Sequence, residues 1–152
     1  MGYFIIRARL NKENIVPLKI VWNEAFSVGS QLLDQQHQQL FALLQKAADC
    51  IKDESPNNRG AFHSILNEVC LYTSTHFRTE EALLKQCEYP DLEAHKAEHF
   101  VFLAQISELN FAASQGVVRK VDLHDTLFRW LSHHILESDM LYSAYLKKTN
   151  KR

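Results

Sequence analysis

The longest uninterrupted helical pattern in the chain runs from about Ala61 to Cys87, and it places the strongest limit on the fold. Core-type side chains recur there at steps of three and four residues, which puts them on one face of about seven helical turns. A face of this length is buried only when other long helices pack against it. The stripe consists of Phe62, Ile65, Leu66, Val69, Thr73, His76, Phe77, Glu80, Leu83, Leu84 and Cys87.

Three further amphipathic stretches accompany this one: over about 34–51, from 92 to a stop at Gln115-Gly116, and from about Val118 or Asp122 to Lys147. The breakers KDESPNNRG and Tyr89-Pro90-Asp91 separate them. We therefore expect an all-α protein, an antiparallel up-down four-helix bundle. The expected division is an N-terminal extension of unknown role over 1–20, the bundle over 21–148 and a short tail over 149–152. The inner face of the fourth helix is expected to carry Leu123, Leu127, Leu131, His134, Leu141 and Tyr145.

Composition excludes several classes of partner. Seventeen Lys and Arg against eighteen Asp and Glu leave no charge excess, and no basic cluster with interleaved aromatics occurs, so no nucleic acid is expected. The N-terminal apolar run Tyr3–Ile6 is too short for a secretory signal or a membrane span, so no membrane is expected either. Three cysteines without a CxxC motif are typical of reduced thiols and indicate a cytoplasmic location.

Histidines fall on the stripes that should face the core. Each of the four helices contributes at least one, and two carboxylates accompany them: Glu80 follows His76 by four residues, and Asp139 follows His134 by five. Polar groups on an apolar face need partners once the bundle closes, so this pattern indicates a shared metal site. The candidate ligands are His37, His76, Glu80, His95, His99, His134 and Asp139.

Other assignments compete with parts of this set. His133 and Glu137 form a second His-x-x-x-Glu pair, although the stripe through Leu127 and Leu131 selects His134. Five residues of α-helix turn by about 140°, so Asp139 requires a π-turn, a bend or a wide inward face. Residues expected at the surface, or without a role in the site, are Glu81, His63 and His124.

The ligand types favour two six-coordinate ions. Five imidazoles and two carboxylates exceed one tetrahedral zinc site. If both carboxylates bridge, their four oxygens, the five imidazole nitrogens and an oxo or hydroxo group shared by both ions fill about eleven of the twelve coordination positions. One position then stays open. Imidazole and carboxylate around an open position suit iron and dioxygen, although ligand type alone leaves zinc and manganese open.

Three segments resemble the hemerythrin family, in particular the bacterial hemerythrins: WNEAFSVGSQLLDQQHQQL, HFRTEEALLKQCEYPDLEAHKAEH and WLSHHILESD. They carry the family's His, His-x-x-x-Glu, His-x-x-x-His and His-x-x-x-x-Asp elements in order. The resemblance implies two iron ions with a bridging oxo or hydroxo group. His95, His99 and His134 would hold one ion, His37 and His76 the other, and Glu80 and Asp139 would bridge.

The same resemblance implies reversible dioxygen binding, as a hydroperoxide at the open-site iron, by an oxygen carrier, store or sensor. Phe77, Trp130 and Leu131 would line an apolar pocket there. Few residues follow the bundle, so a carrier or store is expected rather than a sensor. The Glu-x-x-His motifs of oxidising di-iron enzymes do not occur, which favours a binding protein over an enzyme. The alternative is a redox enzyme acting on peroxide or nitric oxide, or an iron-handling protein. An electron donor or an oxygen-consuming protein would be a further partner, and the sequence does not fix the oligomeric state.

Overall fold

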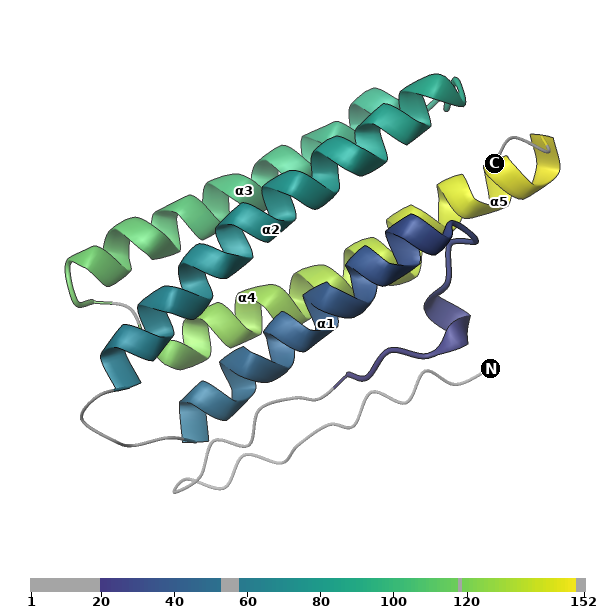
Figure 1. Cartoon of the computed structure of the whole chain (residues 1–152). Helices are drawn as coiled ribbons and strands as arrows, with labels where there is room; N and C mark the ends of the chain where they lie inside the picture. The colour runs from purple at the N-terminus through teal and green to yellow at the C-terminus, as the bar shows by residue number, and fades with distance from the viewer. Residues whose placement is uncertain (1–19, 53–57, 118, 150–152) are drawn as a thin grey trace.

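The computed structural model describes residues 20–52, 58–117 and 119–149; the predicted extension up to residue 19 and the last three residues of the predicted tail lie outside them. Within this range all regular structure is helical, as Figure 1 shows. No described helix is both long and apolar enough to cross a membrane. The elements are the 3-10 turn η1 (Glu24–Phe26), α1 (Gln31–Lys52), α2 (Asn58–Gln86), α3 (Leu92–Ser114), α4 (Lys120–His133), the π-helical turn η2 (His134–Ser138) and α5 (Asp139–Thr149).

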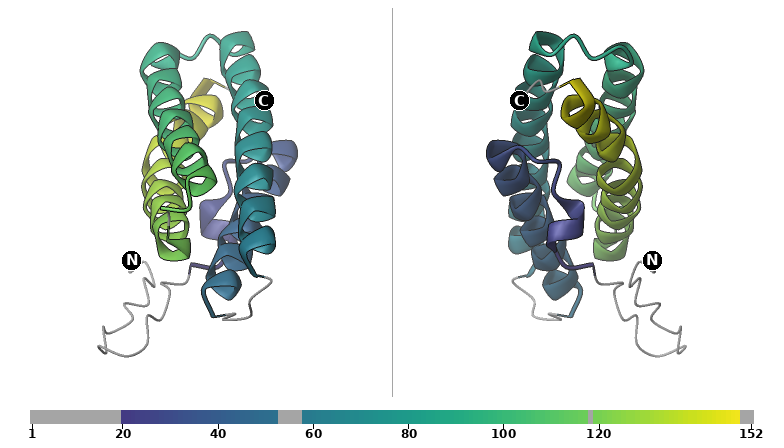
Figure 2. Two further views of the ribbon diagram at one scale, coloured as in Figure 1. Left: turned by 90° about the vertical axis from the view of Figure 1, so that its left-hand side faces the viewer. Right: turned by 90° about the vertical axis from the view of Figure 1, so that its right-hand side faces the viewer.

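The helices form the predicted antiparallel four-helix bundle. The elements α4, η2 and α5 follow one another as a single long rod, which is the fourth helix of the bundle (Figure 1). Helix α1 packs against both α2 and α4, and α2 packs against α3. The two side views in Figure 2 show the helices aligned along one long axis. Every helix can therefore present side chains to the same central volume at one level of the bundle.

The start of α1 is fixed by Asp34, which lies one turn before His37. Its carboxylate accepts hydrogen bonds from the Val28 N–H at 2.8 Å and from the Ser27 hydroxyl at 2.6 Å. In the loop between Val28 and Asp34, Gly29 adopts φ +82°, a left-handed conformation that residues with a Cβ rarely take. The Ser143 hydroxyl of α5 donates to the Val28 carbonyl at 3.0 Å, so the same loop also fixes α1 against α5.

The connection between α2 and α3 is short and tightly bonded. Glu88 closes α2 with φ +54°, and the hydroxyl of Tyr145 on α5 donates to its carbonyl at 2.9 Å. Pro90 then precedes the first turn of α3, as its lack of an N–H and its fixed φ favour. This tight turn sets the register in which α2 and α3 face each other.

The core consists of two clusters, one on each side of the histidine layer. The larger lies toward the end of α1 and the start of α2 and includes Leu40, Leu66, Phe102, Ile106 and Leu127, all almost inaccessible to water. The smaller joins α1, α2 and α5 around Leu33, Leu84 and Tyr142. Each fully buried Leu or Phe contributes roughly 1.5–3 kcal/mol relative to exposure, so these clusters stabilise the polar layer between them.

The fourth rod departs from the predicted face after His134. Leu141 is 66% exposed rather than on the inner face, and Tyr145 is only partly buried. The cause is the π-turn, which adds one residue to a turn and so rotates everything after it. Asp139, Tyr142 and Leu146 occupy the inward positions instead.

Candidate metal centre

The seven polar residues named from the sequence lie together in the middle of the bundle. His37 comes from α1, His76 and Glu80 from α2, His95 and His99 from α3, and the remaining two from the fourth rod; all are buried. The π-turn brings His134 and Asp139 to the same face, because the Asp139 N–H donates to the His134 carbonyl five residues earlier. The five-residue step is thereby accounted for in physical terms. The converging residues are His37, His76, Glu80, His95, His99, His134 and Asp139.

Glu80 divides its two oxygens between two groups of histidines. Its Oε2 atom lies 3.2 Å from Nε2 of His76 and 3.9 Å from Nε2 of His37. Its Oε1 atom contacts Nε2 of His95 and lies 3.9 Å from Nε2 of His99. One carboxylate thus faces histidines of α1 and α2 with one oxygen and histidines of α3 with the other.

Asp139 makes the same division from the opposite side of the cluster. Its Oδ2 atom lies 3.3 Å from Nε2 of His37. Its Oδ1 atom lies 3.2 Å from Nε2 of His134 and 3.6 Å from Nε2 of His95. The two carboxylates therefore define two adjoining subsites, one with two histidines and one with three. In agreement, two sets of possible ligand atoms each lie within 4.8 Å of one another: Glu80, His95, His99 and His134, and His37, His76 and Glu80.

Side chains around the cluster orient three of the imidazole rings through their other nitrogen, Nδ1. The Nδ1 of His76 lies 3.0 Å from the Gln36 amide oxygen, that of His99 lies 2.8 Å from Glu81, and that of His134 lies 2.8 Å from Glu98. Each acceptor favours the tautomer with the proton on Nδ1. The Nε2 lone pair of each ring is then directed into the cluster, as a metal ligand requires.

Two imidazole nitrogens of the three-histidine subsite lie so close together that a cation beside them is favoured. Nε2 of His99 and Nε2 of His134 lie only 2.9 Å apart, and in both rings Nδ1–H donates a hydrogen bond to a carboxylate. Two acceptor nitrogens at this distance repel each other unless a positive charge lies beside both. The three-histidine subsite therefore has the donor chemistry of a cation site.

Unpaired polar atoms indicate that the two-histidine subsite also suits a cation. Buried atoms without a hydrogen-bond partner among the described residues include Nε2 of His37 and His76, Oε2 of Glu80 and both oxygens of Asp139. Buried polar atoms are rarely left in this condition, because each unpaired group costs on the order of 1–3 kcal/mol. Metal ions between these atoms would satisfy all of them.

Burial also sets the protonation of the cluster. Desolvation lowers the pKa of His37 and His134, and it lowers the pKa of His99 to about 2, so all three rings are neutral near pH 7. Desolvation and then the charge of Glu80 raise the pKa of Asp139 well above its usual value. For Glu80, desolvation is outweighed by the neighbouring imidazoles of His37, His76 and His95, which hold its pKa well below the usual range. Neutral imidazole is the ligand form of histidine.

Aromatic side chains cover the three-histidine subsite. Phe77 stacks on His99 with ring centres 3.8 Å apart, and Trp130 stacks on His134 at 4.6 Å. Phe77 and Trp130 also contact each other at 5.2 Å. Leu131 is fully buried in the larger core cluster. Trp22, which the sequence did not single out, lies 6.2 Å from His37. The surroundings of the cluster are apolar, and this limits the access of water.

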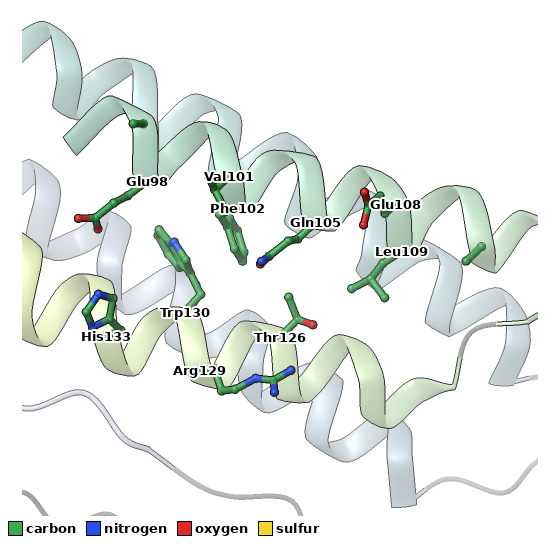
Figure 3. A pocket seen from close by; sticks show the side chains of 12 residues that line it. Glu98, Val101, Phe102, Gln105, Glu108, Leu109, Thr126, Arg129, Trp130 and His133 are labelled. Atoms are coloured by element: carbon green, nitrogen blue, oxygen red, sulfur yellow. The ribbon is translucent and has the colours of Figure 1, made fainter. Parts of the chain in front are cut away.

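A groove between α3 and α4 reaches one side of this aromatic cover. It has a volume of about 920 Å³, and Figure 3 shows Trp130 and Glu98 at one end of it. Both residues contact His134, the first by stacking and the second by a hydrogen bond. Trp130 and Glu98 therefore connect the groove to the buried cluster at His134.

The remaining sequence assignments differ in outcome. His133 lies on the surface and pairs with Glu137 at 3.0 Å, so it is not a rival to His134. The surface prediction for Glu81 was wrong, because Glu81 is a partly buried hydrogen-bond partner of His99. His124, expected at the surface or without a role in the site, is fully buried outside the cluster, with its ring centre 6.1 Å from that of Phe128. Gln36 and Glu98 were missed as well; the general need of a ligating imidazole for an Nδ1 acceptor is the signal that points to such residues.

Comparison with known proteins agrees with this arrangement. The family model described as the hemerythrin HHE cation binding domain matches residues 28–146. A bacteriohemerythrin of Stenotrophomonas maltophilia is 30% identical over 128 residues, which cover 84% of this chain and 82% of the relative. Myohemerythrin-1 of Phascolopsis gouldii is 31% identical over 131 residues, covering 86% and 98%.

Solved structures show the same likeness in three dimensions. A crystal structure of wild-type hemerythrin superposes with a TM-score of 0.74 at 28% identity, covering 82% of this chain and 95% of that chain. The family match spans the segment that supplies every residue of the buried cluster. The chain therefore belongs to the hemerythrin family.

Proposed function

We propose that the buried cluster holds two iron ions and that the chain binds dioxygen reversibly there. One observation carries this proposal: Glu80 and Asp139 each direct one oxygen to a two-histidine group and the other oxygen to a three-histidine group. A single metal ion could not contact both groups of histidines, because the two groups face different oxygens of the same carboxylates. Membership of the hemerythrin family supports iron as the metal.

The residues divide between the two ions by the same contacts. His95, His99 and His134 would hold one ion, His37 and His76 would hold the other, and Glu80 and Asp139 would each contribute one oxygen to either ion. When bound in the ferrous form with one position open, such a pair supplies the electrons that dioxygen takes up on binding and returns on release.

The protein's own contribution is orientation and the exclusion of water. Gln36, Glu81 and Glu98 hold three imidazoles through Nδ1, so that each ring keeps its lone pair toward the site. Phe77 and Trp130 cover the cluster on one side, and their apolar faces admit a small neutral molecule more readily than water or an ion. A buried, mainly neutral ligand set also disfavours high oxidation states, which suits binding rather than oxidation of a substrate.

Reversible dioxygen binding and redox catalysis differ in whether dioxygen is released unchanged or consumed together with electrons from a donor. The reduced protein should take up one dioxygen per two irons and release it unchanged on argon purging, as measured with an oxygen electrode in a closed cell. Addition of hydrogen peroxide or nitric oxide, with ascorbate as electron donor, should give no sustained consumption. Continuous consumption at a rate proportional to protein concentration would instead assign a redox enzyme.

A further inference from the structure

Helix α3 is apolar on two opposite faces. One face is buried and carries Phe102, Ile106 and Ala113 besides the two histidines of the cluster. The opposite face is exposed, yet it presents Phe100 at 73% and Phe111 at 71% exposure. A surface helix ordinarily carries polar residues on its outer side, and two large aromatic rings on one exposed stripe indicate a contact surface.

The exposed stripe has the spacing of a helix-pairing seam. Its residues follow one another at steps of three, four, three, four and three, and all of them are exposed. On an α-helix these steps keep them within an arc of about 100°. Alternating steps of three and four are the heptad pattern by which two helices pack side by side at a small crossing angle. The stripe consists of Ala97, Phe100, Ala104, Ser107, Phe111 and Ser114.

The stripe is also symmetric about its midpoint, which lies between Gln105 and Ile106. Reading outward from that point, Ala104 corresponds to Ser107, Phe100 to Phe111, and Ala97 to Ser114. Each pair matches in size, small with small and aromatic with aromatic. A stripe of this kind is self-complementary when a second copy runs in the opposite direction, because a two-fold axis through the midpoint exchanges the paired positions.

We propose that α3 is the interface of a homodimer in which the two α3 helices pack antiparallel around a two-fold axis. At the centre, Ala104 faces Ser107 of the second copy, and these small side chains let the helices approach closely. On each side of the centre, Phe100 faces Phe111 of the second copy, so two aromatic layers enclose the small ones. Aromatic pairs of this kind add stability beyond the area that they bury.

Two charged residues, Lys96 and Glu108, lie on opposite flanks of the stripe. The two-fold axis keeps each flank on the same side, so along the helices the two Lys96 side chains lie about 28 Å apart and the two Glu108 side chains about 7.5 Å apart. Glu108 is therefore the one flanking residue among 92–114 whose charge opposes the pairing, and its exposure to solvent keeps that repulsion weak. Each Phe ring at this exposure leaves on the order of 150 Å² in contact with water, so the four rings bury roughly 600 Å². With Val101, 54% exposed beside the stripe, the interface falls in the range of weak, reversible complexes.

The first test is the molar mass in solution, measured by sedimentation equilibrium of the iron-loaded full chain from the low micromolar to the hundred-micromolar range. The wild type should pass from monomer to dimer within this range. The double variant Phe100→Ser, Phe111→Ser should dimerise at least about 30-fold more weakly. Leu141→Ser removes an equally exposed apolar residue of α5 and should dimerise as the wild type does. A wild type that stays monomeric, or a double variant that dimerises like the wild type, would overturn the proposal.

A second test fixes the direction of the helices and does not depend on the Phe variants. In a Cys70→Ser background, Ala97→Cys and Ser114→Cys proteins are treated with a short bismaleimide, separately and mixed. Ala97 lies beside Ser114 of the second copy in the antiparallel pair, but about 25 Å from the second copy's Ala97. The mixture should therefore cross-link much faster than either protein alone. Cross-linking of each protein with itself as fast as in the mixture would contradict the two-fold arrangement.

Discussion

The Nδ1 atom of His134 lies 2.8 Å from Oε2 of Glu98, and this contact joins the buried cluster to the surface of the bundle. His134 is fully buried, whereas the Glu98 side chain is 41% exposed in the α3–α4 groove. The Ser138 hydroxyl donates to the same oxygen at 2.7 Å. The hydrogen bond from His134 lowers the pKa of Glu98 to about 2, so the acceptor carries a full charge near neutral pH.

Replacement of Glu98 should therefore weaken iron binding without touching a ligand. Glu98→Ala removes the acceptor and frees the His134 ring to rotate, and we expect a loss of about 10- to 100-fold in iron affinity. Glu98→Gln retains an acceptor oxygen and should lose less. Competition with a ferrous chelator measures the affinity. Glu108→Ala is the matched control, because Glu108 lines the same groove about 15 Å further along α3. Equal effects of Glu98→Ala and Glu108→Ala would refute a specific role for Glu98.

Two adjacent histidines provide a direct test of the ligand assignment. His134→Ala should remove the iron of the three-histidine subsite and abolish dioxygen binding, because it deletes a buried Nε2 donor. His133→Ala deletes only an exposed ring paired with Glu137 and should leave iron content and dioxygen binding unchanged. Iron content by plasma emission spectrometry distinguishes them. Loss of iron in the His133 variant with retention in the His134 variant would reverse the assignment.

The two carboxylates should control how many ions the site holds. Glu80→Gln and Asp139→Asn each retain the shape of the side chain but remove the anion that faces both histidine groups. Iron should fall from two per chain to one or fewer in each variant, because two cations in adjoining subsites repel each other when the negative charge between them is removed. Glu137→Gln, on the surface of the same π-turn, serves as the control. Retention of two irons by both site variants would show that these residues do not bridge.

Backbone conformation at two helix ends predicts a pair of opposite stability changes. Glu88 has φ +54°, where a side chain is strained, so Glu88→Gly should stabilise the fold by about 0.5–1 kcal/mol. Gly116 has φ +73° with open space around it, so Gly116→Ala should destabilise by about 1 kcal/mol through backbone strain alone. Urea unfolding of the metal-free chain measures both. Two changes of the same sign would contradict the conformations described here.

Iron should also contribute to the stability of the bundle. Several buried polar atoms of the cluster have no hydrogen-bond partner among the described residues, and iron in the proposed site would bind these atoms only in the folded chain. Ferrous iron at 100 times its dissociation constant should therefore raise the free energy of unfolding by about 2.7 kcal/mol. Anaerobic thermal unfolding with and without a chelator measures the difference. A melting temperature independent of iron in the wild type, at concentrations where iron is bound, would count against the buried cluster as the binding site.

The bundle and six of the seven clustered residues follow from periodicity in the sequence, whereas Asp139 lies off the α-helical stripe and was expected from the hemerythrin resemblance. Steps of three and four residues placed His76 and Glu80 on the stripe of α2, and the same rule chose His134 over His133. These inferences succeed because burial on a helix depends mainly on residue spacing. Only a local departure from α-helical geometry defeats the rule, as at Leu141, where the π-turn rotates the face by one residue.

The residues around the cluster were not accessible to the same reasoning. Glu98 is adjacent to His99 in sequence, yet its carboxylate bonds His134 on another helix. Gln36 likewise precedes His37 but bonds His76. Such contacts depend on the rotation of one helix against its neighbour, which a pattern within one helix does not encode. The burial of His124, at a position outside the main stripe of α4, was likewise not predictable from spacing.

The central claim is a two-iron centre that binds dioxygen and releases it. Its most direct test is the optical spectrum of the iron-loaded protein, recorded after anaerobic reduction, after exposure to dioxygen and after return to low dioxygen, with iron counted per chain. We predict two irons per chain and a visible band that appears with dioxygen and disappears on its removal over repeated cycles. A single iron per chain, or a one-way change to a stable ferric spectrum at the first exposure, would contradict the claim.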